Sequence, residues 1–175
     1  MKFIELAKER YSVRSYSSKK IEEDKLQLIL EAGRVAPTAC NNQPQRVLVI
    51  QSDEGLAKIA GTAPSKMFGA PCVIVVCADR TKTWIRPIDG MNSADIDASI
   101  VTDHMMLQAT ELGIGSVWIC SFDASQIKEK FKLPEGVEPI NVLALGYTEE
   151  KPKSSERHVT KRKKLSETVF YETFN

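Results

Sequence analysis

Cys72-Val73-Ile74-Val75-Val76-Cys77-Ala78 is the stretch that decides the fold. It is short, continuously apolar and rich in β-branched residues, which is typical of a strand buried on both faces. Working outward from it, apolar runs predict three further strands, at 47–50, 116–119 and 140–145. The run at 47–50 is expected to be buried in the sheet as well.

Helical spacing of apolar residues separates these strands. It predicts helices over 2–10, 21–36, 53–61, 97–112 and 124–131. Residues 79–93 have no clear period and are predicted as a long loop, in which Trp84 and Arg86 are candidate substrate contacts. Because helices and strands alternate without strict βαβ spacing, the sequence predicts an α+β fold: a mixed, mostly antiparallel sheet flanked by helices on both faces.

The composition predicts one soluble domain over residues 1–175. Hydrophobic residues make up 42% and charged residues 27%, which is ordinary for a globular protein. The net charge of +1 gives no overall attraction to nucleic acid or to an anionic membrane, so any anion site must be local. The N-terminus does not resemble a signal peptide, and no apolar run approaches the length of a membrane span. We therefore expect a cytoplasmic protein without nucleic-acid or membrane partners.

The four cysteines are Cys40, Cys72, Cys77 and Cys120, and no two form a C-x-x-C pair. With only two histidines, the spacing of zinc ligands is absent, and no metal site is expected. The cysteines are predicted to be reduced, buried thiols.

The C-terminal residues change in character. Residues 149–164 are polar and nearly without core-forming side chains, yet the end of the chain is apolar again, with Val169, Phe170, Tyr171 and Phe174. This pattern favours an arm that docks on something, such as a second subunit, because a solvated tail has little use for aromatic residues. A frayed terminus is the alternative.

Arg10-Tyr11-Ser12-Val13-Arg14 follows the first predicted helix. If this segment is extended, alternate side chains point the same way, and Arg10, Ser12 and Arg14 converge. Guanidinium groups match phosphate oxygens in pairs, and the hydroxyl adds a donor. A late basic run, Lys161-Arg162-Lys163-Lys164, could return to the same phosphate. Taken alone, Arg10 and Arg14 are better explained as exposed arginines at the end of a helix, and the late basic run as a solvated surface.

Pro37-Thr38-Ala39-Cys40-Asn41-Asn42-Gln43-Pro44 is a turn bracketed by two prolines. It is rigid and rich in amide groups, and a carboxamide pairs well with the N3–O4 edge of a flavin. The alternative is a plain connector between a helix and a strand.

In Gly113-Ile114-Gly115-Ser116-Val117-Trp118, the two glycines allow close backbone approach. This is not a dinucleotide fingerprint, because it follows a helix and not a strand; a helix cap leading into a core strand is the alternative.

Taken in order, these segments resemble the FMN-dependent nitroreductase family in its compact form. The family's R-x-S-x-R, P-S-x-x-N-x-Q-P, G-x-G-S-x-W and L-G-Y/F patterns correspond to residues 10–14, 37–44, 113–118 and 145–147, with a basic residue, Arg162, near the end. The resemblance runs from about residue 3 to the end of the chain. This chain departs from the family at Thr38, Gln45 and Thr148, and it lacks the inserted helices that shape the pocket of longer members, so the substrate stays open.

The resemblance implies an intertwined homodimer with two FMN sites at its interface, in which the C-terminal arm (148–175) is exchanged between subunits. It assigns the FMN phosphate to Arg10, Ser12, Arg14 and Arg162, with Arg162 reaching it from the partner subunit. Tyr11 and Lys161 belong to the same cofactor-binding set. The residues implied to lie at the flavin ring are Pro37, Thr38, Ala39, Asn41, Gln43, Ile119, Cys120 and Ser121, and a backbone N–H near Cys120 would bond flavin N5.

The function that the resemblance implies is an FMN oxidoreductase. It would take hydride from NADH or NADPH and reduce a small acceptor, such as a nitroaromatic or a quinone, by a ping-pong mechanism on the flavin. Because the redox chemistry belongs to the flavin, no acid–base residue is assigned. Two alternatives stay open: a flavin-binding sensor or carrier with little turnover, and a non-catalytic interaction module.

Overall fold

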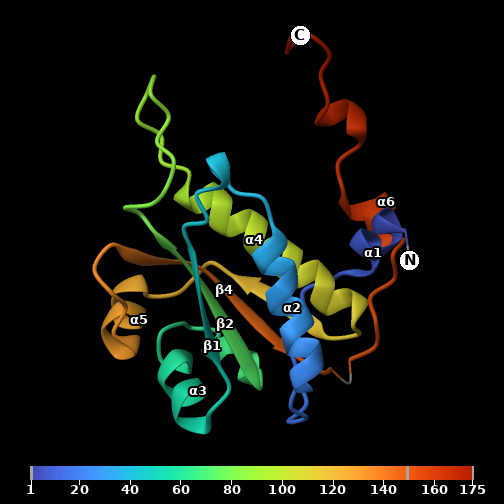
Figure 1. Cartoon of the computed structure of the whole chain (residues 1–175). Coiled ribbons are helices and arrows are strands. Elements are labelled where there is room, and N and C mark those ends of the chain that lie inside the picture. The colour runs from blue at the N-terminus through green and yellow to red at the C-terminus, as the bar shows by residue number, and fades with distance from the viewer. Residues whose placement is uncertain (1, 149, 175) are drawn as a thin grey trace.

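The computed structural model describes residues 2–148 and 150–174 (Figure 1). Its elements are, in chain order, α1 (Phe3–Glu9), α2 (Glu23–Val35), β1 (Gln45–Ile50), α3 (Asp53–Ala60), β2 (Cys72–Asp79), α4 (Ala94–Glu111), β3 (Gly115–Ile119), α5 (Ala124–Phe131), β4 (Val137–Gly146) and α6 (Arg157–Lys161). The helices and strands predicted from the sequence are confirmed to within a few residues. The short helix α6 was not predicted, because it lies in the polar arm and has no apolar stripe.

The four strands form one sheet in the order β1-β2-β4-β3, and all neighbouring strands are antiparallel. The parallel component is an isolated bridge between Ser12 and Ser116. β4 continues through Pro139, which lacks an N–H, and the β2–β4 register shifts beside it, between Val76 and Cys77. The prediction of a mostly antiparallel sheet is therefore confirmed.

β1 lies at an edge of the sheet, and the prediction of a buried strand at 47–50 was right for Ile50 but wrong for Val47. Val47 is 39% exposed, and β1 pairs with β2 on one side. A short apolar run shows that one or both faces of a strand are covered, but it does not show whether both of its edges are paired.

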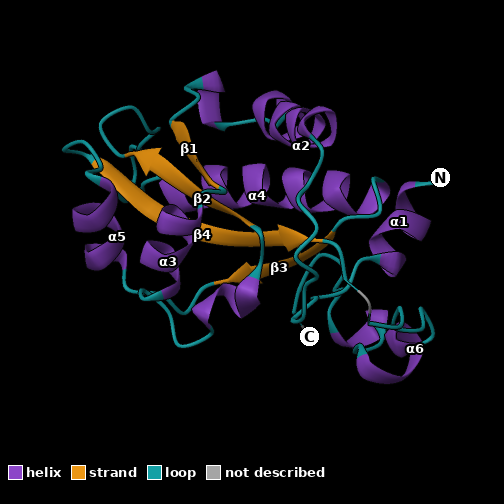
Figure 2. Cartoon of the chain, turned by 90° about the horizontal axis from the view of Figure 1, so that it is seen from below, coloured by secondary structure: helices purple, strands orange, loops and turns teal. Residues whose placement is uncertain are grey.

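Helices cover both faces of the sheet, as predicted (Figure 2). Alternate residues of β2 point to opposite faces, so Ile74 and Val76 pack with α2 and α4, whereas Val73 and Val75 pack with α3 and α5. α2 can approach α4 closely at Gly33, where a Cβ would lie 2.9 Å from Met105 Cγ. α4 thus runs across the sheet as the central helix, and the functional segments are arranged around its two ends.

Two parts of the chain project from this body. The loop between β2 and α4 projects from the body (Figure 1). It is closed by a bridge between Ile85 and Asn92, and it exposes Ile88. The arm after β4 exposes its apolar end, and Tyr171 and Phe174 are 85% and 88% exposed. In the described ranges, no helix combines the length and the apolar character needed to cross a membrane.

The cysteines divide into two pairs. Cys72 and Cys77 are buried in β2, as predicted, and burial raises the pKa of each thiol to about 12. Cys40 and Cys120 are exposed, contrary to the expectation of buried thiols, because Cys40 lies in the turn between α2 and β1 and Cys120 directly follows the end of β3.

Candidate functional site

The segment that follows α1 runs in contact with the first residues of β3. The Val13 N–H donates to the Ser116 carbonyl at 2.9 Å, beside the bridge between Ser12 and Ser116. This approach depends on a glycine, because a Cβ at Gly115 would lie 2.8 Å from Val13 Cγ2. The G-x-G pattern therefore positions the segment that carries Arg10, Ser12 and Arg14.

The C-terminal arm returns to the same place. The Arg157 guanidinium, at the start of α6, donates to the carbonyls of Lys8 and Arg10 at 2.8 and 2.6 Å. His158 Nε2 lies 3.1 Å from the Lys8 carbonyl. The last carbonyls of a helix have no partner within it, so these contacts hold α6 against the carboxyl end of α1 (Figure 1).

This contact gathers positive charge around Arg10. The Arg10 side chain is half-buried, and burial lowers the pKa of its guanidinium, followed by the charges of Arg157 and Arg162. Lys161 ends α6 beside Arg162. The resemblance implied that Arg162 reaches the phosphate from a partner subunit. Here Arg162 comes close enough that, besides burial, its charge lowers the pKa of Arg10 in its own chain, because α6 is fastened to α1.

The arginines of the chain fall into two classes. One class forms ion pairs with carboxylates: Arg34, Arg46, Arg80 and Arg86. The other forms no ion pair with any residue in 2–148 or 150–174: Arg10, Arg14, Arg157 and Arg162. Arg14 donates to the Ser12 carbonyl at 3.4 Å and lies over the Phe68 ring, 5.9 Å from its centroid. Arg10, Arg14 and Arg162 of this second class come from the two basic segments, and cations without ion pairs are what an anion site requires.

A cleft of about 620 Å³ opens beside Arg10 and Tyr11. The start of β3 and the beginning of the arm form its walls. Ser116 lines it, and its hydroxyl is buried without a hydrogen-bond partner among the described residues. The pKa of Tyr11 is raised, first by partial burial and then by the negative charge of Glu150.

The Pro37–Pro44 turn contains a short 3-10 helix, Ala39–Asn41. Cys40, Asn41 and Gln43 have positive φ angles of 51°, 54° and 50°. Thr38 closes the turn, because its carbonyl accepts from the Asn41 N–H at 3.0 Å and its hydroxyl accepts from the Gln43 N–H at 3.1 Å. Successive left-handed residues other than glycine are costly, and such conformations concentrate at functional sites.

Asp97 of α4 anchors this turn, and the sequence pattern did not single it out. Its carboxylate is 1% exposed and accepts from the Ala39 N–H at 2.9 Å and from the Ser93 hydroxyl at 2.8 Å. The Ser93 hydroxyl in turn accepts from the main-chain N–H of Trp84 at 3.2 Å. The sequence did offer one signal, since Asp97 falls on the buried stripe of the longest predicted helix. A carboxylate buried there needs hydrogen-bond donors from elsewhere in the chain.

The turn and the arginines lie at opposite ends of α4. Asp97 holds the turn near the amino end, whereas Thr110, near the carboxyl end, lines the cleft beside Arg10. At 1.5 Å per residue, these positions are about 20 Å apart. A single chain thus brings Arg10 and Arg162 together but does not bring them to Pro37, Thr38, Ala39, Asn41 and Gln43.

The end of β3 forms a third part of the candidate site. Ile119 is buried, and Cys120 and Ser121, which follow it, are exposed. Trp118 is fixed by a hydrogen bond of 2.9 Å from its indole N–H to Asn141. The same strand therefore starts beside the arginines and leads to these three residues.

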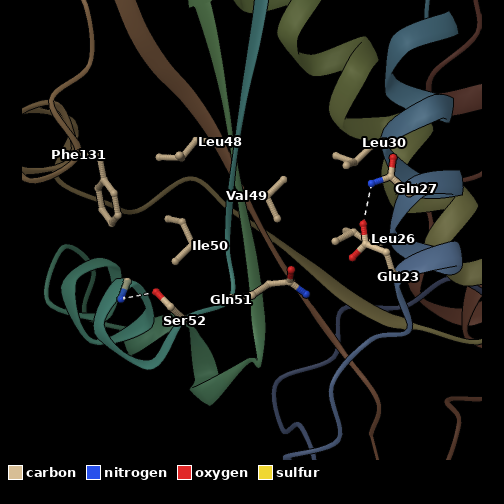
Figure 3. A pocket seen from close by; sticks show the side chains of 11 residues that line it. Glu23, Leu26, Gln27, Leu30, Leu48, Val49, Ile50, Gln51, Ser52 and Phe131 are labelled. Carbon is tan, nitrogen blue, oxygen red and sulfur yellow. Dashed lines mark hydrogen bonds between the residues drawn. The ribbon is translucent and has the colours of Figure 1, made fainter.

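A separate hollow of about 520 Å³ lies between α2 and the edge strand β1 (Figure 3). Val49 points toward Leu26 and Leu30 of α2, whereas Leu48 and Ile50 point to the other face of β1, where Phe131 lies. None of the site residues predicted from the sequence lines this hollow. Its apolar walls flank an edge of the sheet that has no strand beside it in the described chain.

Comparison with known proteins gives consistent matches. Residues 7–65 and 60–147 match the sequence model of the Nitroreductase family. A crystal structure of a nitroreductase family protein from Clostridium difficile 630 is 53% identical, with a TM-score of 0.96, and the match covers 99% of this chain and 100% of that one. A Methanothermobacter thermautotrophicus protein named for NADH dehydrogenase and NAD(P)H nitroreductase is 32% identical over 158 residues, 87% of this chain and 80% of its own.

A nitroreductase from Desulfovibrio desulfuricans, crystallised in complex with FMN, is 27% identical. Its TM-score is 0.82, and the match covers 98% of this chain and 97% of that one.

Proposed function

Since this chain belongs to the nitroreductase family, we propose that it is an FMN-dependent oxidoreductase that takes hydride from NADH or NADPH and reduces a small acceptor, such as a nitroaromatic or a quinone. The observation that carries the proposal is the set of arginines without carboxylate partners, at the junction of α1, β3 and the arm. A phosphate group supplies the negative charge that these residues lack.

The residues present fit FMN at its phosphate end. Besides burial, the charge of Arg162 reaches Arg10 and lowers its pKa, against a smaller opposing effect of Asp103, and neither arginine forms an ion pair with a carboxylate of the described chain. We assign the phosphate to Arg10, Arg14, Arg162 and Lys161, with the Ser12 hydroxyl and Tyr11 beside them. The buried, unpartnered hydroxyl of Ser116 further marks this place as one built for a polar ligand.

When bound, FMN supplies the centre that accepts hydride from the reductant and passes it to the acceptor. The chain's own part is to bind and orient. We assign the ring edge to the Pro37–Gln43 turn, whose shape is fixed by Thr38 and by the contact of Asp97 with Ala39. Ile119, Cys120 and Ser121 would hold the ring at the end of β3. No acid–base residue is assigned, and the reductant and acceptor would use the same face in turn, in a ping-pong sequence.

We propose that the active form is a homodimer. Because the turn and the arginines lie about 20 Å apart along α4, one FMN can contact both only if a second copy supplies one of them. The second copy also explains the exposed apolar end of the arm. The hollow beside β1 suits the partner's arm, since apolar side chains flank an edge strand to which an extended segment can add (Figure 3). In this arrangement residues 1–175 form one domain, and the arm (148–175) docks on the partner through its apolar end while α6 stays against α1 of its own chain.

We also propose a cytoplasmic location. Cys40 and Cys120 are exposed and unpaired, and exposed thiols persist best in a reducing compartment.

The test is the absorption spectrum of the purified protein, followed by anaerobic addition of NADH or NADPH. We expect a yellow protein whose flavin band is bleached by the reductant and restored by a quinone. A protein that is colourless after incubation with FMN and removal of the free flavin would reject the proposal. Bound FMN without consumption of NADH or NADPH would favour the alternative of a flavin carrier or sensor, and light scattering would test the dimer.

A further inference from the structure

Arg157 differs from the other arginines without an ion pair, because main-chain carbonyls surround its guanidinium. Its two terminal nitrogens are fully engaged with main-chain carbonyls. Nη2 donates to Lys8 and Arg10 at 2.8 and 2.6 Å, and Nη1 donates to Lys153 and Ser154 at 3.0 and 2.8 Å. A guanidinium whose terminal N–H groups are used in this way is not available to hold a phosphate.

These four carbonyls belong to two segments far apart in the sequence. Lys8 and Arg10 lie at the carboxyl end of α1, and Lys153 and Ser154 lie in the arm just before α6. One planar group therefore joins the segment that carries Arg10 to the segment that leads to Arg162. His158 adds a second contact to the Lys8 carbonyl.

The junction also has an electrostatic cost. Docking of the arm brings the positive charges of Arg157 and Arg162 to Arg10, and no carboxylate of residues 2–148 or 150–174 forms an ion pair with any of them. Repulsion among these cations opposes docking of the arm, and an anion placed between Arg10 and Arg162 removes that repulsion. Binding of an anion and docking of the arm must then favour each other, because such coupling is reciprocal.

Resting on the function proposed above, we propose that Arg157 is a positioning residue that fastens the C-terminal arm to the carboxyl end of α1, so that docking of the arm and binding of the FMN phosphate stabilise each other. Arg157 acts through the main chain at Arg10 and Lys153 and does not touch the phosphate. It sets the distance between Arg10 and Arg162.

The experiment compares Arg157→Lys with the wild-type protein and with Arg80→Lys as a matched control. Arg80 is an exposed arginine that pairs with Asp95, at the opposite end of α4 from the arm. Lysine keeps the charge but lacks the planar fork that spans four carbonyls. The dissociation constants for FMN and for riboflavin, which lacks the phosphate, are measured by flavin fluorescence. The rate of tryptic cleavage in the run Lys161-Arg162-Lys163-Lys164 is measured with each ligand.

We expect FMN, but not riboflavin, to slow cleavage of the arm in the wild-type protein and in Arg80→Lys. In Arg157→Lys the dissociation constant for FMN should rise about tenfold or more, since several hydrogen bonds from a charged group are lost. The dissociation constant for riboflavin should not change, and the protection of the arm should disappear. If only the positive charge of Arg157 mattered, Arg157→Lys would bind FMN as tightly as the wild type and show the same protection of the arm.

Two outcomes would overturn the inference: wild-type affinity for FMN in Arg157→Lys, or equal protection of the arm by riboflavin and FMN. If the wild-type protein itself binds no FMN, the proposed function fails as well. If it binds FMN but Arg157→Lys behaves as the wild type does, only the role of Arg157 is rejected.

Discussion

The two ends of α4 differ in how the charged side chains around them are satisfied. At the amino end the Asp97 carboxylate is buried, and donors from the Ala39 main chain and the Ser93 hydroxyl satisfy it within the chain. At the carboxyl end, Arg10 and Arg162 approach each other, and the described residues offer them no ion pair. The first end is satisfied within the chain and fixes the shape of a turn, whereas the second holds cations without ion pairs in the described residues. In the function proposed above, the shape and the charge for one ligand are built at these separate places.

The largest effect should come from removing charge at the carboxyl end. In the double variant Arg10→Ala, Arg14→Ala, the dissociation constant for FMN should rise by more than about 100-fold, because two contacts of roughly 1.5–3 kcal/mol each are lost. The affinity for riboflavin should stay as it is. The control is Arg34→Ala, Arg80→Ala, which removes two arginines that already have carboxylate partners. Equal losses in the two double variants, measured by flavin fluorescence, would contradict the phosphate assignment.

The next effect concerns the amino end. Asp97→Ala should lower the free energy of unfolding by about 3 kcal/mol, since two hydrogen bonds to a buried carboxylate are lost and their donors stay unsatisfied. Asp97→Asn should cost less, because the amide oxygen can still accept from Ala39. Urea denaturation followed by circular dichroism measures both. A loss within about 0.5 kcal/mol for Asp97→Ala, as at an ordinary surface position, would show that the turn does not depend on this carboxylate.

A smaller effect is expected where β3 meets the segment of Arg10. In Gly115→Ala the new methyl group would lie 2.8 Å from Val13 Cγ2 and 3.1 Å from the Gly146 carbonyl, so the free energy of unfolding should fall by about 1–3 kcal/mol. Gly61→Ala is the control, because its nearest neighbour is the flexible end of Lys130 at 3.4 Å. The affinity for FMN should fall in Gly115→Ala alone. Similar stabilities of the two variants would argue against a close fit at Gly115.

The smallest effect is a pH dependence at the root of the arm. The Tyr147 hydroxyl donates to Glu22, and this bond, followed by that from Lys19, lowers the pKa of Glu22 to about 2. Because the folded-state pKa lies below the unfolded value, the stabilisation is present above about pH 4.5 and is lost as the pH falls toward 2. Thermal unfolding from pH 6 to pH 2 should therefore show a smaller decline for Glu22→Gln than for the wild type. Parallel declines would mean that Glu22 does not contribute.

Most of the fold could be predicted from the sequence, because its elements carry strong local signals. α5 begins at Ala124 and ends at Phe131, as its helical spacing indicates, and β2 follows from a run of β-branched residues. The environment of β1 could not be predicted in the same way. Whether a strand has one neighbour or two depends on long-range pairing, and Val47 looks the same in both cases.

For the candidate site, the sequence singled out residue types but not their arrangement in space. The basic segments at Arg10 and Arg162 stood out, and the structure brings them together. The anchoring role of Asp97 depends on a contact 58 positions away in the sequence, which no local pattern reveals. Arg157 lies in a polar stretch where one more cation carries no signal, and its four carbonyl partners come from backbone geometry alone.

The hydrogen bond between Trp118 and Asn141 has a practical consequence. It holds one of the two indoles of the chain in a fixed orientation, a single residue before the end of β3. The other indole, Trp84, lies in the projecting loop. The protein therefore carries a built-in optical reporter: emission from Trp118 should be quenched by energy transfer to a nearby yellow chromophore. Emission from Trp84 can be removed by Trp84→Phe to isolate that signal.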